Sequence, residues 1–350
     1  MKQNIFLTTF PAHKSQNVGD ALIADSTLRL IRARWPEFVP AIQFRGNLLD
    51  GFTKRSRHNV IAPGFSVSNG TSVEIYPLFS DLDRISKFFA FGCSYQHPIP
   101  EHDSFELPYD QETLVFLRSM AEQHGPFFCR DRLIEGRLKS QNIPSDFSGD
   151  LALFSEEKIG RDLGYKLDDL KIVVSLQHHT RYLEQSIILL KELKKEFPNS
   201  QIDISLHSVP KDLYKVITRR ASELSIDCLH LYGDVNKLSA YEHYDLHVGY
   251  RLHAHICFLR NRKPSILLVE DARSFGFSNT SDLSHGCIQA WSAAERDADM
   301  DAPDRAVAFL RSQIDEKFAG YNKTLSFIDQ IYHEKVAPYF DDMVEKLRTS

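Results

Sequence analysis

Short apolar runs alternate with longer amphipathic runs along almost the whole of this chain, and this alternation limits the possible folds more than any other feature. Runs such as Ile172–Leu176 and Ser265–Val269 are apolar on both faces, as strands are when helices cover both sides of a sheet. Strands that alternate with helices are joined by right-handed crossovers and form mainly parallel sheets. The sequence therefore predicts an α/β fold with mainly parallel sheets.

The same pattern places the individual elements. Strands are expected at Ile5–Thr9, Val60–Ala62, Phe88–Phe91, Phe127–Cys129, Ile172–Leu176, Ile202–Leu206, Cys228–Leu231, Leu246–Val248 and Ser265–Val269. Helices are expected at Asp20–Trp35, Gln111–Gln123, Arg132–Ser140, Tyr182–Glu196, Lys211–Leu224, Asn236–Glu242 and Leu252–Asn261.

Chain length and one charged segment predict two Rossmann-like domains. With 350 residues, the chain exceeds the roughly 250–300 residues that one hydrophobic core usually serves. The charged segment Glu156–Asp169 separates two series of strands and helices, so we place the domains at residues 1–160 and 161–320. Residues 321–350 carry an apolar stripe at helical spacing, which predicts a C-terminal helix packed on the body and kinked at Pro338.

The composition excludes several classes of protein. The 42 lysines and arginines against 47 aspartates and glutamates give a net charge of −5, and without a basic excess no nucleic acid partner is expected. The longest apolar runs are strand-sized, so no transmembrane segment is expected. The first residues lack the apolar core of a signal peptide. The five cysteines form no Cys-x-x-Cys pair, which indicates reduced thiols. We therefore expect a cytoplasmic protein.

In open parallel sheets the ligand site lies beyond the carboxyl ends of the strands, so the strand-to-helix junctions carry the functional information. The first junction contains Asn17-Val18-Gly19-Asp20, in which Asn17 is a good helix N-cap and Gly19 allows a ligand close to the backbone. Free N–H groups at such a helix start attract an anion or a sugar hydroxyl. An ordinary capped helix start explains the same residues, and the sequence leaves both interpretations open.

Later junctions add charged and titratable side chains. Arg130 follows a strand and either binds a phosphate or carboxylate or pairs with Asp150. His178 and His207 end strands of the second half, where a histidine is either a cleft residue or a hydrogen-bonded structural residue. The sequence does not separate these interpretations.

The densest cluster of such side chains spans residues 244–256. If Gly249–Arg251 forms the turn from strand to helix, Arg251 and His253 both reach the cleft, whereas His255 lies further in and is structural. Because His253 and His255 diverge and no acidic residue has fitting spacing, no metal site is expected.

A second cation follows the acidic pair Glu270-Asp271. Arg273 lies near the same corner as Arg251, and two arginines with a histidine at one edge of the cleft indicate an anionic small molecule.

These residues resemble the markers of the polysaccharide pyruvyl transferase family. The family has an early Asn-x-Gly-Asp, then an Arg-Asp and a Gly-Asp-x-Ala that close the first half, and later an Asp ahead of Arg-Leu-His-Ala. The corresponding segments here are Asn17-Val18-Gly19-Asp20, Arg130-Asp131, Gly149-Asp150-Leu151-Ala152, and Asp245 followed by Arg251-Leu252-His253-Ala254.

The resemblance implies a glycosyltransferase-B-like pair of Rossmann-like domains, with the acceptor on the N-terminal side and the donor on the C-terminal side. It also implies transfer of the enolpyruvyl group of phosphoenolpyruvate to a sugar of a polysaccharide or its precursor, forming a pyruvate ketal without a cofactor. Arg251 would hold the anionic donor and His253 would transfer protons. The other candidate substrate contacts, taken from these motifs and from the strand-to-helix junctions together, are Asn17, Gly19, Asp20, Arg130, Asp150, His178, His207 and Arg273.

Two departures from the family pattern keep other functions open. Pro63-Gly64-Phe65-Ser66 stands where a Gly-Gly-Ser turn is common, and Arg273 stands where lysine is frequent. The alternatives are a glycosyltransferase-B-type enzyme that uses a nucleotide sugar, with Glu270 on its ribose, and a non-catalytic sugar-binding component. A lipid-linked acceptor, a peripheral position at the inner face of the membrane and a homo-oligomer also stay open.

Overall fold

The computed structural model describes residues 3–10, 16–52, 56–95, 108–209, 212–294 and 297–349. Its strands are β1 (Asn4–Thr8), β2 (Ala41–Phe44), β3 (His58–Pro63), β4 (Ile85–Phe91), β5 (Phe127–Cys129), β6 (Ser145–Phe147), β7 (Lys171–Ser175), β8 (Gln201–Leu206), β9 (Cys228–His230), β10 (Leu246–Gly249), β11 (Ser265–Val269), β12 (Cys287–Gln289), β13 (Trp291–Ser292) and β14 (Asp297–Ala298).

The α-helices are α1 (Val18–Arg34), α2 (Gln111–His124), α3 (Arg132–Ser140), α4 (Leu183–Glu196), α5 (Asp212–Glu223), α6 (Leu252–Arg260), α7 (Ala272–Ser278), α8 (Ala302–Asp315), α9 (Tyr321–Ile331) and α10 (Ala337–Arg348). The short helices are η1 (Leu49–Gly51), η2 (Thr71–Ile75), η3 (Pro77–Arg84), η4 (Leu151–Leu153), η5 (Thr180–Tyr182), η6 (Val235–His243), η7 (Ser281–Leu283) and η8 (Tyr332–Val336). Among the helices described, none combines the length and the apolarity needed to cross a membrane.

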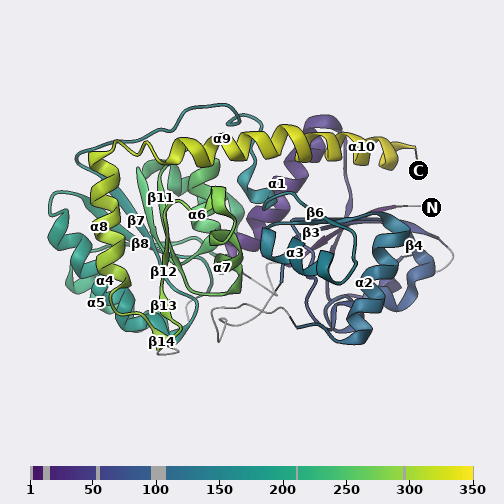
Figure 1. Cartoon of the computed structure of the whole chain (residues 1–350), viewed down its shortest axis with the longest axis horizontal. Coiled ribbons are helices and arrows are strands. Elements are labelled where there is room, and N and C mark those ends of the chain that lie inside the picture. The colour runs from purple at the N-terminus through teal and green to yellow at the C-terminus, as the bar shows by residue number, and fades with distance from the viewer. Residues whose placement is uncertain are drawn as a thin grey trace.

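Two parallel sheets form the two lobes of the molecule (Figure 1). The first has the strand order β2-β1-β3-β4 and the second the order β12-β11-β10-β7-β8-β9, with every neighbouring pair parallel. The parallel pair β5-β6 continues the first lobe through a bridge between Cys93 and Cys129. The mainly parallel α/β architecture expected from the apolar runs is confirmed, and Ile172, Val173 and Val174 of β7 are fully buried.

Every strand expected from the apolar runs is present, with ends that differ by up to three residues. The segment Asn236–Glu242 is the exception among the expected α-helices, because it forms the 3₁₀-helix η6 instead. Among the strands and α-helices, the elements that the sequence did not predict are β2, β6, β12, the antiparallel pair β13-β14, α7 and α8. Most are short, and the strands among them are defined by pairing with neighbours rather than by their own apolar runs.

Helix α1 follows β1 of the first lobe but also contacts the second (Figure 1). The backbone N–H of Val18 donates to the carbonyl of His207, just beyond β8, at 2.9 Å. Leu22 of α1 belongs to the same hydrophobic core as Leu238 and Tyr241 of η6. The helix that carries the Asn-x-Gly-Asp motif is therefore held by both lobes.

The last two helices run from the second lobe back to the first (Figure 1). The ring of Phe340 in α10 stacks on Phe91 of β4 with centroids 5.2 Å apart, and the Arg34 guanidinium contacts Glu156 at 2.6 Å and Asp341 at 2.5 Å. The π turn η8 interrupts the tail just before Pro338, which occupies the first turn of α10. The predicted packing of a C-terminal helix on the body is confirmed, whereas the domain limits at 160 and 320 stay a prediction.

Candidate active site between the two lobes

The strand orders place a ligand crevice in each lobe, and the two crevices meet. In the first sheet the chain adds strands on both sides of β1, which lies between β2 and β3. In the second sheet it does the same around β7, which lies between β10 and β8. Ligands bind outside the carboxyl ends of the strands at such switch points. Thr8, Thr9 and Gly64 stand at the first of these ends, and Arg251 follows β10 at the second.

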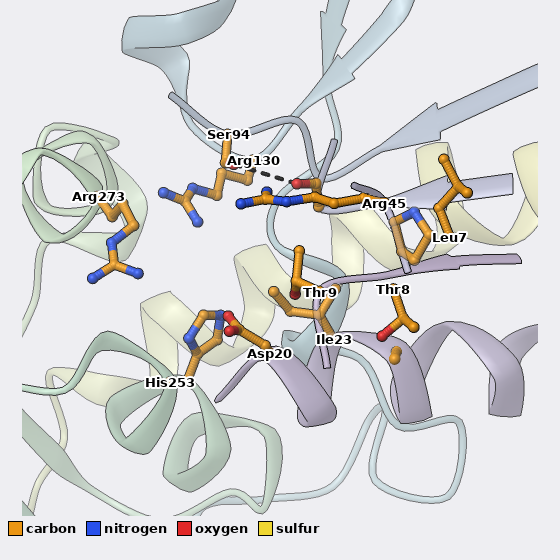
Figure 2. Close-up of a pocket in the computed structure, with 13 residues that line it drawn as sticks. Leu7, Thr8, Thr9, Asp20, Ile23, Arg45, Ser94, Arg130, His253 and Arg273 are labelled. Carbon is orange, nitrogen blue, oxygen red and sulfur yellow. Dashed lines mark hydrogen bonds between the residues drawn. The ribbon is translucent and has the colours of Figure 1, made fainter. Parts of the chain in front are cut away.

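Two cavities open at these ends and share residues. The N-terminal cavity, of about 440 Å³ including space open to solvent, is lined among others by Asp20, Arg45, Arg130, His253 and Arg273 (Figure 2). The C-terminal cavity, of about 290 Å³ by the same measure, is lined among others by Asn17, His207, Arg251, His253, Glu270 and Arg273. His253 and Arg273 therefore lie at the junction of the two cavities.

The Asn17-Val18-Gly19-Asp20 motif organises this junction from the end of α1. The Asn17 side chain caps α1 by accepting from the backbone N–H of Gly19 at 3.1 Å, and it also accepts from the Arg251 guanidinium at 3.2 Å. A Cβ on Gly19 would lie 2.5 Å from Nδ1 of His253, so only glycine leaves room for this imidazole. Gly19 was expected to admit a ligand, but the group packed against it is His253, and Gly19 lines neither cavity.

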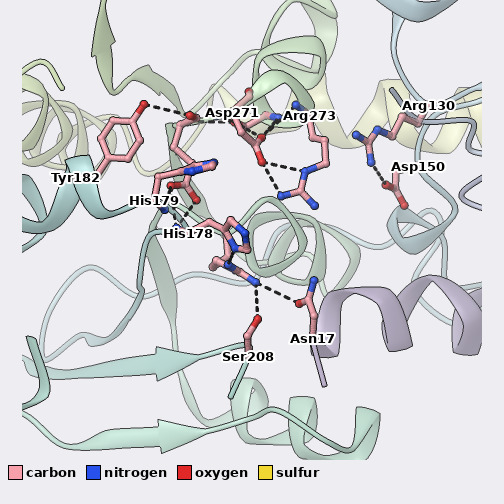
Figure 3. A network of polar contacts seen from close by, with 12 residues as sticks. Asn17, Arg130, Asp150, His178, His179, Tyr182, Ser208, Asp271 and Arg273 are labelled. Atoms are coloured by element: carbon pink, nitrogen blue, oxygen red, sulfur yellow. Dashed lines mark hydrogen bonds and ion pairs between the residues drawn. The ribbon is translucent and has the colours of Figure 1, made fainter. Parts of the chain in front are cut away.

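Arg251 is the N-cap residue of α6, and its side chain is held by uncharged groups, of which Figure 3 labels Asn17, His178 and Ser208. Its guanidinium donates to His178 Nδ1 at 2.9 Å and to Ser208 Oγ at 3.1 Å, in addition to Asn17. Its backbone N–H donates to Ser175 Oγ at 3.0 Å. Because no carboxylate of the described ranges lies within 4 Å of this guanidinium, its charge is available to an anionic ligand.

His253, Asp150 and Arg130 form a buried cluster of ionisable side chains beside the N-terminal cavity. His253 Nε2 lies 3.6 Å from Asp150 Oδ2, and Arg130 Nη1 lies 3.9 Å from the same oxygen. Burial raises the pKa of Asp150, but His253 and Arg130 outweigh it, so the pKa lies below its usual value and the carboxyl is ionised. The sequence left open whether Arg130 pairs with Asp150 or binds a ligand, and the geometry provides for both, because Arg130 Nε and Nη2 have no hydrogen-bond partner among the described residues.

The acidic pair after β11 has two different environments. Asp271 caps α7 and accepts from Arg273 Nη2 at 2.6 Å and Nε at 2.9 Å. Burial raises the pKa of Asp271, but Arg273 and the backbone donors outweigh burial and hold this pKa well below its usual range. Glu270 accepts from the backbone N–H of His178 at 2.9 Å. Burial and Asp271 raise the pKa of Glu270 to about 8, so this side chain is protonated at neutral pH.

The other histidines divide between the cavity and the core. His207 lines the C-terminal cavity, and its Nε2 lies 2.6 Å from the Tyr241 hydroxyl; burial lowers the pKa of His207 well below its ordinary value, so the ring is neutral. His178 and Asp150 do not line either cavity but hold residues that do. His255 is fully buried with Nδ1 2.8 Å from Ser265 Oγ, which confirms that it is structural.

Sequence reasoning missed Arg45, which lines the N-terminal cavity directly after β2. It was missed because Ala41-Ile42-Gln43-Phe44 is neither a continuous apolar run nor a long alternation, and the strand was not predicted. Had β2 been recognised, the strand-end rule would have pointed to Arg45. Ser94, which forms an isolated bridge with Ser66, also lines this cavity (Figure 2).

Comparison with known proteins identifies the family from these segments. The sequence model of the family "Polysaccharide pyruvyl transferase" matches residues 17–271, which contain the Asn17 cap, Arg130, Asp150 and the Arg251–His253 turn. The chain belongs to the polysaccharide pyruvyl transferase family. No curated protein matches the sequence.

Solved structures are similar to this pyruvyl transferase family member in fold. UDP-GlcNAc 2-epimerase from Neisseria meningitidis bound to UDP-GlcNAc is 14% identical, with 100% of each chain covered and a TM-score of 0.51. S. aureus MnaA with UDP is 11% identical, with 93% of this chain and 91% of that chain covered and a TM-score of 0.51. The glycosyltransferase-B-like arrangement of two Rossmann-like lobes is thereby confirmed.

Several other matched structures are longer than this chain. It spans 56% of an accessory secretory protein chain from Streptococcus pneumoniae, at 12% identity, 85% coverage of this chain and a TM-score of 0.45.

Proposed function

We propose that this protein transfers the enolpyruvyl group of phosphoenolpyruvate to a sugar of a polysaccharide or its precursor. Membership of the family supports the class of reaction. The observation that carries the proposal is that His253 and Arg273 line both cavities. A side chain shared by two cavities lies where a donor in one meets an acceptor in the other, which is where protons have to be transferred.

The reaction needs cations for the donor and a group that moves protons. One sugar hydroxyl adds to C2 of phosphoenolpyruvate while the methylene carbon takes up a proton and becomes a methyl group. A second hydroxyl then displaces phosphate at the same carbon, which closes the ketal and releases inorganic phosphate. Of the two hydroxyl protons, one is thus matched by the proton that the new methyl group takes up, and the other leaves with phosphate.

We assign these roles to residues at the junction of the cavities. Arg251, whose partners are uncharged, binds the anionic donor in the C-terminal cavity together with Arg273. His253 transfers the protons, and the ionised Asp150 behind its ring keeps it in place. The acceptor occupies the N-terminal cavity, whose single carboxylate lining residue among those described is Asp20. No metal has a role in this proposal.

Ligand stabilisation tests the donor. A ligand that binds only the folded state raises the melting temperature, so phosphoenolpyruvate should stabilise the purified protein and UDP-GlcNAc should not. Stabilisation by UDP-GlcNAc alone would refute this proposal and favour a glycosyltransferase-B-type enzyme that uses a nucleotide sugar.

Variants test the roles. His253→Ala should lower the acceptor-dependent release of phosphate from phosphoenolpyruvate by about 10²–10⁴-fold, the usual contribution of a proton-transfer group. His230→Ala, at an exposed position outside both cavities, should not lower it. Arg251→Lys should weaken donor binding by about tenfold, against no change for the exposed Arg219→Lys. A fully active His253→Ala protein with native circular dichroism would exclude the proton-transfer role.

A further inference from the structure

The arginines around the two cavities differ in how far carboxylates already neutralise them. Arg273 is bound twice by Asp271, and Arg130 has Asp150 and Asp131 at 3.9 and 3.8 Å. Arg45 lies over the ring of Tyr76, 5.8 Å from its centroid, and no carboxylate within the described ranges approaches it to 4 Å. Among the described arginines of the N-terminal cavity, Arg45 is therefore the one whose charge is least compensated.

Arg45 also stands apart from the donor. It extends from the end of β2 in the first lobe and lines only the N-terminal cavity, whereas Arg251 lines only the C-terminal one. In Figure 2 the guanidinium groups of Arg273, Arg130 and Arg45 follow one another across the cavity, with Arg45 furthest from Arg273. In the proposed function Arg251 and Arg273 bind the donor's phosphate and carboxylate, so Arg45 is a cation that the donor does not need.

A second observation indicates a ligand at this end of the cavity. Arg130 is only 4% exposed, yet its Nε and Nη2 have no hydrogen-bond partner in the described structure, although Arg130 lines the N-terminal cavity. Buried guanidinium nitrogens are rarely left without acceptors, and a phosphate or carboxylate supplies several oxygens at once. The hydroxyl side chains of Thr9 and Ser94, which line the same cavity, suit the sugar to which such a group would be attached.

We infer that Arg45, with Arg130, forms an oxyanion subsite for the acceptor, so that the acceptor is a sugar bearing a phosphate or a carboxylate group. This inference rests on the proposed function, because the acceptor side is defined by the donor's place beside Arg251. Arg45 is then a specificity-determining residue that selects charged over neutral acceptors.

The test measures oxyanion binding to the whole 350-residue chain with the donor site filled. Inorganic phosphate is titrated calorimetrically into protein saturated with phosphoenolpyruvate, and glucose 1-phosphate and glucuronate are then compared to distinguish a phosphate from a carboxylate. The variants are Arg45→Gln and Arg45→Lys, with Arg219→Gln, which removes an exposed charge outside both cavities, as the control. Arg45→Lys keeps the charge should Arg45→Gln fail to fold.

Losing one charged hydrogen-bonding partner weakens binding by about 10- to 100-fold, and this is the change expected for phosphate with Arg45→Gln. Arg45→Lys should lose part of the affinity and Arg219→Gln none, and the affinity for phosphoenolpyruvate should stay within about threefold in all of them. Phosphate binding within twofold of the wild type in Arg45→Gln, or no phosphate binding by the wild type, overturns the inference. Equal weakening of phosphate and phosphoenolpyruvate also overturns it, because Arg45 would then be a donor ligand.

Failure of the proposed function gives a different result. A wild-type protein that does not bind phosphoenolpyruvate but still binds phosphate through Arg45 would refute the donor and leave the oxyanion subsite standing.

Discussion

Adding one methyl group at Gly19 should displace the imidazole on which the proposed chemistry depends. In Gly19→Ala the new Cβ would lie 2.5 Å from Nδ1, 2.8 Å from Cγ and 2.9 Å from Cβ of His253. Ordinary contacts between heavy atoms are about 3.5–4.0 Å, so the His253 side chain has to move by about 1 Å. A misplacement of that size lowers the rate of a positioned reaction by about 100-fold.

The effect on stability is small because two contributions oppose each other. Overpacking a buried site destabilises by about 1–3 kcal/mol, whereas replacing glycine by alanine in a helix stabilises by about 1 kcal/mol. Gly19→Ala should therefore be less stable than the wild type by about 0–2 kcal/mol and remain folded. Its loss of activity would then reflect geometry rather than unfolding.

A matched variant separates the two contributions. Gly136 lies in α3, and a Cβ there would meet nothing within 4 Å. Gly136→Ala should gain up to about 1 kcal/mol and keep full activity. The assays are urea denaturation and phosphate release from phosphoenolpyruvate. If Gly19→Ala matches Gly136→Ala in both assays, the argument that Gly19 makes room for His253 is wrong.

Three further predictions concern the scaffold. Gly249→Ala should yield little folded protein, because its Cβ would overlap the backbone oxygen of Ser175; soluble protein with the wild-type melting temperature would contradict this. Burial lowers the pKa of His255 to about 3 in the folded protein, whereas in the unfolded chain this imidazole takes up a proton at about pH 6.5. Because the unfolded state binds the proton more tightly, the free energy of unfolding should fall as the pH drops from about 6.5 to about 3. His255→Gln should flatten that slope in denaturant titrations, and an unchanged slope would exclude His255 as its source. Phe340→Ala should cost about 3–5 kcal/mol in urea denaturation, since Phe340 is 1% exposed and stacks on Phe91, whereas a cost below 1 kcal/mol would mean that α10 is loosely held.

The sequence predicted those strands that carry a continuous apolar run of their own. The run from Ile172 to Val174 is buried on both faces, so its side chains alone indicate a strand. Ser145–Phe147 and Cys287–Gln289 contain too few apolar residues for such a signal, and they are strands only because β5 and β11 pair with them.

The part of the candidate site that lies on one strand-to-helix turn, Arg251 and His253, was predictable from the sequence. Arg251 and His253 follow one strand end, and the sequence alone placed both at the cleft, where both line the C-terminal cavity. The contact between Gly19 and His253 joins residues from the two lobes, and no local pattern encodes it. The same holds for Arg45, whose position depends on a strand that exists through pairing with β1.

The return of α10 to the first sheet has a consequence for how the protein is made. Phe340 stacks on Phe91, which leaves the ribosome more than two hundred positions earlier. During synthesis the face of β4 that α10 covers therefore stays open until residues 337–348 have left the ribosome, although β4 itself was made much earlier. A chain that stops near residue 160 would therefore leave that lobe with an exposed apolar surface.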